Sequence, residues 1–394
     1  MNKDTLHRFN YTKTMKDMMT IPKNLICLSH LRWDFVYQRP QHLLSRFAKN
    51  MNVYVFEEPF FDADDHNYLS ISARDTNVTV IVPHLKNGLS ETAVDQTLTH
   101  LFDQFMEDFR LQDCLFWYYT PMAIKFTDRH KPKVTVYDCM DELSAFAFSH
   151  TALPELERKL MAKADVVFTG GHSLYEAKKR FHSNIFAQPS SIDKAHFEQA
   201  RTMPEAEDQA AIKGPKIGFF GVVDERFDIN LLGEMATQKP DWQFIIIGPV
   251  VKIDLAQLPK NQNIHYLGQR CYKELPTYLA GWDVALIPFM INESTRFISP
   301  TKTPEYLAAH IPVVSTPIRD VVKPYGIKNL VHIKSTADEF IQAIDEELTR
   351  SDRAEWIAQV DEFLEEISWQ KTYSAMKDQI QNTIEMATKI SIAS

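Results

Sequence analysis

The sequence predicts an α/β protein built from two Rossmann-like domains that face each other across a cleft. The chain has 394 residues, which is too long for one ordinary hydrophobic core. Short continuous apolar runs alternate with amphipathic segments, and such runs are typical of parallel strands buried on both faces. Polar residues follow several of these runs, where doubly wound sheets bind their ligands. Together these observations favour two parallel sheets, each covered by helices.

The first half of the chain alternates strands and helices. The apolar runs predict strands at 24–30, 52–59, 78–83, 114–121, 133–142 and 165–171. The amphipathic segments predict helices at 40–50, 93–109 and 153–164. We assign residues 23–200 to this first domain. Residues 1–22 mix Lys, Arg and Met without a clear period, so we expect a disordered lead-in rather than a peripheral membrane helix.

The second half repeats the pattern after a polar, charged stretch at 197–213, which we interpret as the link between the domains. The apolar runs predict strands at 216–223, 242–250, 263–269, 284–289, 312–316 and 329–334. Helices are expected at 231–238, 274–283 and 304–310, and in three further segments from 337 to 390. We assign residues 213–370 to the second domain. The helix at 371–394 is expected to cross back onto the first.

The stretch “SPTKTPEYLAAHIPVVSTP”, at 299–317, predicts a helix that starts near Thr301 and leads into a buried strand. Hydroxyl residues cap helices, and proline is tolerated in the first turn. Lys302 at this position is suited to hold a phosphate group. Glu305, one turn further, could accept hydrogen bonds from sugar hydroxyls. The competing interpretation is a plain capping box with Glu305 in solvent.

The sequence lacks the motifs of several common enzyme classes. Neither first strand is followed by GxGxxG, and the chain contains only 11 glycines, which disfavours a dinucleotide-dependent dehydrogenase. A Walker A loop, GxSxG and HExxH are also absent from the sequence. The net charge of −9 argues against nucleic acid as the main partner. We therefore expect a ligand held between two sheets, with no cofactor.

The cysteines and the hydropathy pattern bear on metal sites and location. The 4 cysteines are far apart and show no CxxC spacing, so neither a zinc site nor a disulfide framework is expected. No apolar run approaches the length of a membrane span, and the N-terminus lacks the apolar core of a signal peptide. We expect a cytoplasmic protein without bound metal, which could reach the inner face of the membrane if its acceptor is lipid-linked.

Four stretches resemble segments of glycosyltransferase family 4: “VVFTGGHSLYEAKKRF”, “IGFFGVVDERFDINLL”, “NIHYLGQRCYKELPTYLAGWDVALIPF” and “ISPTKTPEYLAAHIPVVSTPI”. Two more, “SHLRWDFVYQRPQHLLSRFA” and “VYDCMDELSAF”, resemble the first-domain signatures of its bacterial polysaccharide and teichuronic-acid branch. The resemblance implies a GT-B fold, a nucleotide-sugar donor and metal-independent sugar transfer. It also implies retention of the anomeric configuration.

The same resemblance implies donor-binding roles by position. Glu305 matches the second glutamate of the family’s E-x7-E motif, whose carboxylate takes the ribose hydroxyls. Lys302 and the residues before it match the loop that holds the diphosphate, where a cation lowers the barrier as charge develops on the leaving group. The implied donor-binding set is Gly221, Val222, Arg226, Gly248, Gln269, Arg270, Ser299, Pro300, Thr301, Lys302 and Glu305.

The sequence departs from the family pattern in two donor loops. The first glutamate of E-x7-E is replaced by Phe297. Glu293 is the nearby carboxylate that could serve the sugar from a shifted loop, and a plain surface position is the alternative. Acidic residues crowd the loop at 224–228 and leave Arg226 as its only obvious cation.

Two carboxylates near a first-domain strand end complete the predicted catalytic set with Glu293. Asp138 falls where many family members place a histidine facing the sugar, and Asp141 lies just beyond it. Either could orient the acceptor hydroxyl or stabilise positive charge on the sugar ring. The structural alternative is that Asp138 caps the next helix and Asp141 pairs with Arg39.

The first strand and the segment after it supply candidate acceptor-binding residues. They are His30, Arg32, Trp33 and Arg39. For each of these residues alone, a structural or solvated role is the competing expectation.

The predicted function is a retaining glycosyltransferase that uses a nucleotide-sugar, with UDP-sugar as the expected donor. Its acceptor would be a glycan or lipid-linked molecule in cell-surface polysaccharide synthesis. The alternative is a catalytically degenerate homologue that binds nucleotide or glycan within a biosynthetic complex. A nucleotide-sugar epimerase would need further His, Asp and Glu residues directed at C2 of the sugar, and the sequence offers no such set.

Overall fold

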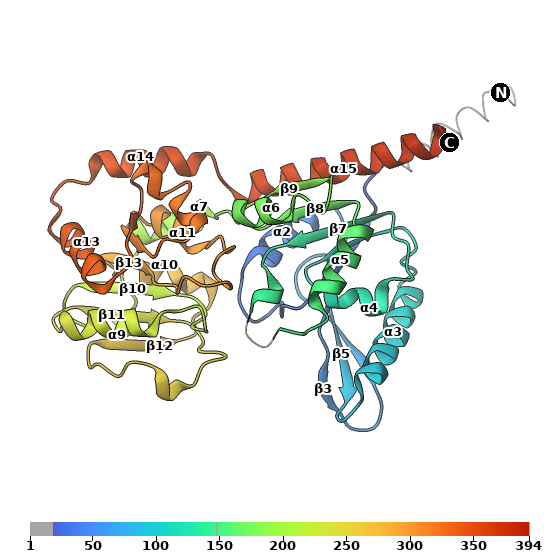
Figure 1. The fold of residues 1–394 in the computed structure, drawn as a ribbon, viewed down its shortest axis with the longest axis horizontal. Helices are drawn as coiled ribbons and strands as arrows, with labels where there is room; N and C mark the ends of the chain where they lie inside the picture. The colour runs from blue at the N-terminus through green and yellow to red at the C-terminus, as the bar shows by residue number, and fades with distance from the viewer. Residues whose placement is uncertain (1–18, 147–148, 394) are drawn as a thin grey trace, which may run out of the picture.

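The computed structural model describes residues 19–146 and 149–393, which form two α/β domains side by side (Figure 1). The N-terminal lead-in expected at 1–22 lies almost wholly outside the described residues. Each domain is built on one sheet with helices on both faces, as the alternating pattern predicts. None of the described helices combines the length and the apolar character needed to cross a bilayer.

The first domain is a nine-stranded sheet. Its strands are β1 (Asn24–Ser29), β2 (Asn52–Glu57), β3 (Phe60–Ala63), β4 (Tyr68–Ala73), β5 (Val78–Lys86), β6 (Cys114–Tyr118), β7 (Val134–Cys139), β8 (Val166–Thr169) and β9 (Ile185–Ala187). Their order is β3-β5-β2-β1-β6-β7-β8-β9, and β4 pairs antiparallel with β5 in an otherwise parallel sheet. The sequence did not predict β3, β4 or the short β9, because they carry no long apolar run.

Helices cover both faces of this sheet. They are α2 (Arg39–Phe47), α3 (Glu91–Asp108), α4 (Ile124–Thr127), α5 (Leu153–Lys163) and α6 (His172–Lys178). Alternate residues of β1 enter opposite cores, since Leu25 packs with α2 and Ile26 packs with α3 and α5. The start of α3 is set by Ser90, whose hydroxyl accepts a hydrogen bond from the backbone N–H of Ala93.

The second domain has a six-stranded sheet in the order β12-β11-β10-β13-β14-β15. Its strands are β10 (Lys216–Phe220), β11 (Gln243–Ile247), β12 (Ile264–Gly268), β13 (Val284–Ile287), β14 (Val313–Ser315) and β15 (His332–Ile333). Its helices are α9 (Ile229–Gln238), α10 (Leu275–Leu279), α11 (Lys302–Ala308), α12 (Arg319–Val322), α13 (Ala337–Thr349) and α14 (Ala354–Glu365). Every strand pairing in this sheet is parallel.

The polar stretch at 197–213 is a packed part of the second domain rather than an open linker. It follows α7 (Lys194–Phe197) and contains α8 (Glu207–Ala210). Gln209 is fully buried, donates a hydrogen bond to the carbonyl of Tyr278 (2.9 Å) and accepts one from the indole N–H of Trp282 (2.8 Å). These polar partners explain why a hydrophilic sequence lies inside.

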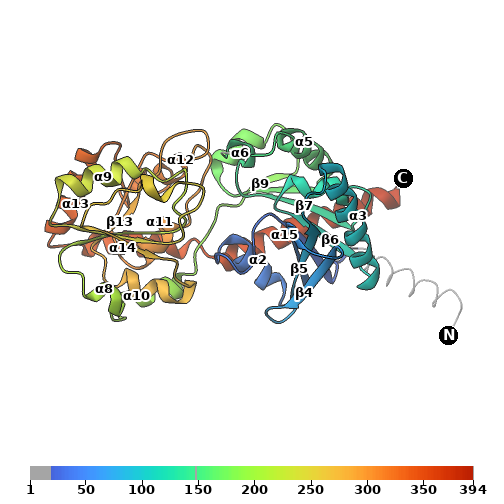
Figure 2. The same cartoon turned by 90° about the horizontal axis from the view of Figure 1, so that it is seen from below.

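The C-terminal helix α15 (Trp369–Ala393) runs from the second domain back across the first (Figures 1 and 2). Its buried residues Trp369, Tyr373 and Met376 pack in the core between α2 and the first-domain sheet. The Trp369 ring stacks on His42 of α2 at a centroid distance of 4.7 Å. This helix therefore ties the two domains together at the side of the cleft.

Candidate active site

A cleft of about 1060 Å³ lies between the domains, at the carboxyl ends of strands from both sheets. Most of the predicted site residues line this cleft. They are Trp33, Arg39, Asp141, Gly221, Val222, Arg226, Gly248, Gln269, Arg270, Ser299, Pro300, Thr301, Lys302 and Glu305. Four others do not line it: His30, Arg32, Asp138 and Glu293.

Two glycine turns shape the second-domain wall of the cleft. Gly221 follows β10 with φ of +141°, and Gly248 follows β11 with φ of +139°. A Cβ atom on Gly248 would clash with the carbonyl of Gly221, and one on Gly221 would clash with the side chain of Lys302. Only glycine therefore permits these two turns and the lysine to lie against one another.

Two oppositely charged side chains on this wall, Lys302 and Glu305, form no ion pair with each other or with another described residue. Lys302 is the first residue of α11, and its ammonium lies 5.7 Å from the ring centre of Phe219 and 5.8 Å from that of Phe289. Burial lowers the pKa of Lys302, and the attraction of Glu305 opposes this shift. Burial likewise raises the pKa of Glu305, opposed by Lys302. Neither group has a protein hydrogen-bond or ion-pair partner in the described chain, so both are available to a ligand.

The start of α11 differs from the predicted capping. Thr301 occupies the N-cap position but makes no side-chain cap, and the Thr303 hydroxyl is buried without a hydrogen-bond partner among the described residues. Glu305 is only 7% exposed, so the interpretation of a plain capping box with a solvated glutamate is wrong. With 7 residues, α11 is too short to offer more than a weak dipole, and the Lys302 ammonium is the main positive charge.

Arg226 and Asp141 both line the cleft, from opposite domains. The Arg226 guanidinium binds both carboxylate oxygens of Asp224, at 2.9 and 2.6 Å, so most of its charge is neutralised within its own loop. It also lies 5.3 Å from the ring centre of Phe146, across the domain boundary. Burial raises the pKa of Asp141, and the nearby Arg226 and Arg39 oppose the shift. The Asp141 carboxylate accepts no hydrogen bond from the described residues, so it can still bind a ligand hydroxyl.

Asp138 and Arg39 form a buried ion pair instead of facing the cleft together. The Arg39 guanidinium binds Asp138 through Nε (3.0 Å) and Nη2 (2.8 Å), and its Nη1 donates to the carbonyl of Gln188 (2.8 Å). The Asp138 side chain is fully buried. Of the predicted alternatives, pairing of Asp141 with Arg39 is wrong, because the partner is Asp138. In this arrangement Asp138 positions the Arg39 side chain, and its buried carboxylate does not face a sugar in the cleft.

The loop between β13 and α11 does not bring Glu293 into the site. The Glu293 side chain is 76% exposed and forms only an ion pair of 3.5 Å with Arg296. Phe297, at the position of the missing motif glutamate, packs against the first-domain core that contains Tyr137 and Leu174. The motif position is thus an apolar contact between the domains.

His30 and Arg32 are not among the residues that line the cleft. Arg32 donates to the Glu57 carboxylate (3.1 Å) and to the carbonyl of Glu58, and its guanidinium stacks 3.8 Å from the ring centre of Phe60. Burial lowers the pKa of His30 to about 4, so its imidazole is neutral at pH 7. Neither side chain reaches the cleft as an acceptor-binding group would.

Gln269 and Arg270 are at the cleft but bind protein groups. Gln269 donates to the carbonyl of Phe35 in the first domain (2.8 Å), and Arg270 pairs with Asp208 (2.7 Å). Their predicted contact with the base would require these bonds to be exchanged. The described residues contain no group of three or more His, Cys, Asp or Glu side chains placed to hold a metal ion.

Comparison with known proteins shows what this chain is similar to. Residues 214–350 match the family model described as glycosyl transferases group 1. TuaH of Bacillus subtilis (strain 168), named for teichuronic acid biosynthesis as a glycosyltransferase, is 25% identical over 231 residues. That match covers 54% of this chain and 58% of the relative’s length. The predicted resemblance to these glycosyltransferases is confirmed.

Solved structures match over nearly the whole chain. A trehalose-6-phosphate structure from E. coli bound with UDP-2-fluoro glucose superposes with a TM-score of 0.66 and 14% identity, and the match covers 91% of this chain and 99% of that one. The chain has the GT-B fold. Sucrose-phosphate synthase from Thermosynechococcus elongatus gives a TM-score of 0.68 at 14% identity, with 94% of this chain and 100% of that chain covered.

The GT-B cleft also contains an aromatic cluster that the sequence did not predict. The Tyr272 ring stacks on His196 at 4.2 Å and meets Tyr37 of the first domain at 4.6 Å. A second contact between the domains joins Asp320 to the start of α6, where the backbone N–H of Ser173 donates to its carboxylate (3.0 Å). Each of these residues is unremarkable in its local sequence, and only the folded arrangement reveals its partner.

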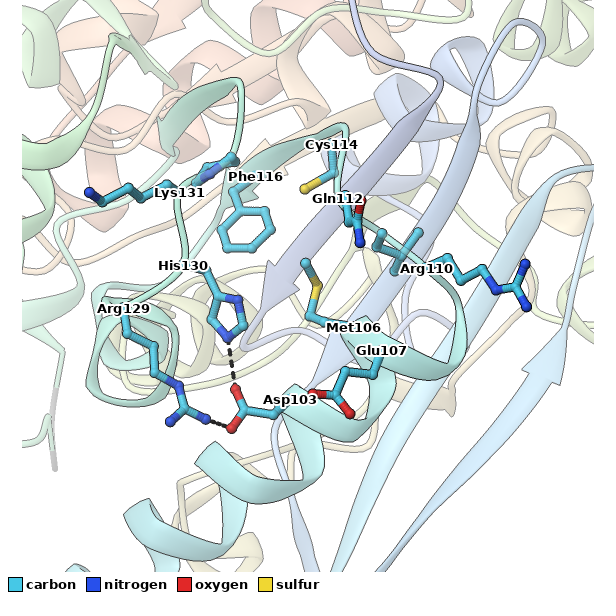
Figure 3. A pocket seen from close by; sticks show the side chains of 12 residues that line it. Asp103, Met106, Glu107, Arg110, Gln112, Cys114, Phe116, Arg129, His130 and Lys131 are labelled. Carbon is cyan, nitrogen blue, oxygen red and sulfur yellow. Dashed lines mark hydrogen bonds and ion pairs between the residues drawn. The ribbon is translucent and has the colours of Figure 1, made fainter.

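Another hollow, of about 680 Å³, lies at the opposite edge of the first-domain sheet of this GT-B fold (Figure 3). There Asp103 pairs with His130 (2.9 Å) and with Arg129, so its charge is already compensated. Arg110 and Lys131 extend away from this pair in Figure 3. The hollow is at the amino ends of β6 and β7, whereas doubly wound sheets bind ligands at the carboxyl ends.

Proposed function

We propose that this protein is a retaining glycosyltransferase that moves a sugar from a UDP-sugar to a glycan or lipid-linked acceptor, without a metal ion. The observation that carries the proposal is the couple of Lys302 and Glu305, which are buried, oppositely charged and free of protein partners in the GT-B cleft. The UDP-2-fluoro glucose bound to the E. coli neighbour and the teichuronic acid assignment of TuaH support this choice of donor and pathway class.

In this proposal each charge acts on one part of the donor. The Lys302 ammonium and the backbone N–H of Val222 bind the diphosphate, and they stabilise the negative charge that develops when the sugar leaves. The N–H of Gly221 is not available, because it donates to the carbonyl of Ile247 (2.8 Å). The Glu305 carboxylate accepts hydrogen bonds from the ribose hydroxyls. On the opposite wall, Asp141 orients the acceptor hydroxyl or stabilises positive charge on the sugar ring. The leaving phosphate itself receives the acceptor proton.

The second candidate is a degenerate homologue that binds nucleotide or glycan within a biosynthetic complex. It is favoured by the apolar contact of Phe297 at the motif position and by the exposure of Glu293. Thermal-shift measurements with UDP, GDP and ADP, followed by hydrolysis of the matching sugar donor, distinguish the two. Binding without hydrolysis or transfer would support the degenerate homologue.

Glu305→Ala is expected to weaken UDP binding by about 10-fold to 100-fold, because hydrogen bonds to a charged group are worth roughly 1.5–3 kcal/mol. Titration calorimetry measures this change. The thermal stability of the free protein should not fall, since the variant removes a buried carboxylate that lacks a partner. Glu305→Gln is the matched control and should retain part of the affinity. Unchanged affinity in the alanine variant would show that the carboxylate does not bind the ribose.

The affinity for UDP-glucose is expected to rise and then fall with pH. Burial raises the pKa of Glu305, so its carboxylate becomes ionised only as the pH rises through that raised value. Burial lowers the pKa of Lys302, so its charge is lost as the pH rises through that lowered value. Dissociation constants measured from pH 5.5 to 10 should pass through a minimum between the two. Lys302→Arg should abolish the loss at high pH, because arginine stays charged.

A further inference from the structure

A second cavity, of about 410 Å³, lies in the first domain beside the cleft. It opens at the carboxyl ends of β1, β2 and β6, between α3 and the start of α4. Much of its lining is apolar, from residues that include Phe56, Phe61, Val94, Leu98, Met122 and Phe126. A cavity of this size and character suits the apolar part of a small ligand. We call it the aglycone cavity.

One layer of residues separates the aglycone cavity from the cleft. Glu57 lines the cavity, and its Oε1 accepts a hydrogen bond from the backbone N–H of Trp33 (2.7 Å), which lines the cleft. Its Oε2 accepts from Arg32 (3.1 Å). The two linings share no residue, so a ligand that occupies both would pass over the rim of this wall.

The approach to the aglycone cavity is apolar as well. Phe61 of β3 lines the cavity and is 48% exposed. A large aromatic side chain half exposed at the edge of the cavity offers apolar surface to a ligand.

The charges around the aglycone cavity disfavour a phosphorylated ligand. Four carboxylates line it: Glu57, Glu58, Glu91 and Asp95. Its lysine, Lys125, is already paired with Glu91 (2.5 Å) and Asp95 (3.4 Å). His150 also faces Glu91, at 3.3 Å. An uncharged ligand would meet no repulsion here, whereas a diphosphate would meet a lining with four carboxylates and one lysine.

We propose that the aglycone cavity binds the apolar aglycone of an uncharged glycolipid acceptor, whose sugar hydroxyl lies in the cleft. This inference rests on the proposed function and narrows it, because it selects a neutral glycolipid over a bare glycan or a lipid diphosphate. The apolar lining and mouth hold the aglycone, and the shared wall at Glu57 sets its distance from the transferred sugar.

Binding of matched glycosides to the full chain, below their micelle concentrations, tests the proposal. Octyl β-glucoside is expected to bind at least about 10-fold more tightly than methyl β-glucoside, since burial of an alkyl chain is favourable. Farnesyl diphosphate should bind more weakly than octyl β-glucoside. Val94→Trp should fill the cavity and remove the preference for the octyl compound, whereas Val94→Ala should preserve it.

UDP binding is measured in the same samples and separates this proposal from the proposed function. UDP affinity should be unchanged in both Val94 variants. If UDP binds but the octyl and methyl glucosides bind equally, or if Val94→Trp leaves the octyl preference intact, the aglycone assignment is overturned and the donor site stands. Tighter binding of farnesyl diphosphate overturns the choice of a neutral ligand. Failure of UDP to bind counts against the proposed function.

Discussion

Replacing Lys302 by methionine is expected to weaken the binding of UDP by about 100-fold, the loss of a charge-assisted contact worth roughly 1.5–3 kcal/mol. The ammonium lacks a carboxylate partner among the described residues, whereas Asp224 neutralises Arg226 and Asp208 neutralises Arg270. Methionine has a similar length and remains apolar, so it keeps the packing over Gly221. Titration calorimetry with UDP at pH 7 measures the effect.

A second variant separates the effect of the charge at position 302 from the effect of the side-chain shape. Lys302→Arg keeps the charge and should bind UDP within a few-fold of the parent if the bulkier guanidinium is accommodated beside Gly221. The stability of Lys302→Met should not fall, because burial makes the ammonium costly in the free protein. If Lys302→Met binds UDP as tightly as the parent, the diphosphate does not lie against α11, and the donor assignment fails.

The donor wall could be predicted from the sequence because its residues are close together along the chain. Lys302 and Glu305 lie one helical turn apart, and a glycine after an apolar run predicts the turn at Gly221. Local spacing also predicted most strands of both sheets, since parallel strands are unbroken apolar runs. The sequence could not show which polar side chains would bind other protein groups and so be unavailable to a ligand.

The partners of polar side chains on the first-domain wall of the cleft could not be predicted from the sequence. Arg39 and Asp138 are 99 residues apart in the sequence, and only the parallel packing of β1 and β7 around β6 brings their side chains together. The same applies to Gln269, whose amide binds a carbonyl of the other domain. Glu293 was chosen for its nearness to a motif position, but a loop can turn a side chain either way, and here Arg296 pairs with it in solvent.

Asp138→Ala is expected to destabilise the protein by about 3–5 kcal/mol, because it leaves the Arg39 guanidinium as an unpaired buried charge. The ion pair of Arg39 and Asp138 is almost fully buried, with side-chain exposures of 2% and 0%. Arg39 also joins the β9–α7 connection through the carbonyl of Gln188 and touches Met376 of α15. Displacement of the Arg39 side chain should therefore weaken several contacts of the first-domain wall at the same time. Urea unfolding of the parent and the variant measures the loss.

The double variant Arg39→Met/Asp138→Leu distinguishes an ion pair from a catalytic carboxylate. Apolar residues of similar volume can replace a buried pair at little cost, so most of the stability should return. Sugar transfer should return with it if Asp138 only positions the wall, with the KM for the acceptor altered more than kcat. A stable double variant that binds UDP normally but has lost transfer completely would instead place Asp138 in the chemistry. Asp141→Asn is the matched contrast, because that carboxylate faces the cleft and its loss should reduce kcat while leaving stability and UDP affinity near those of the parent.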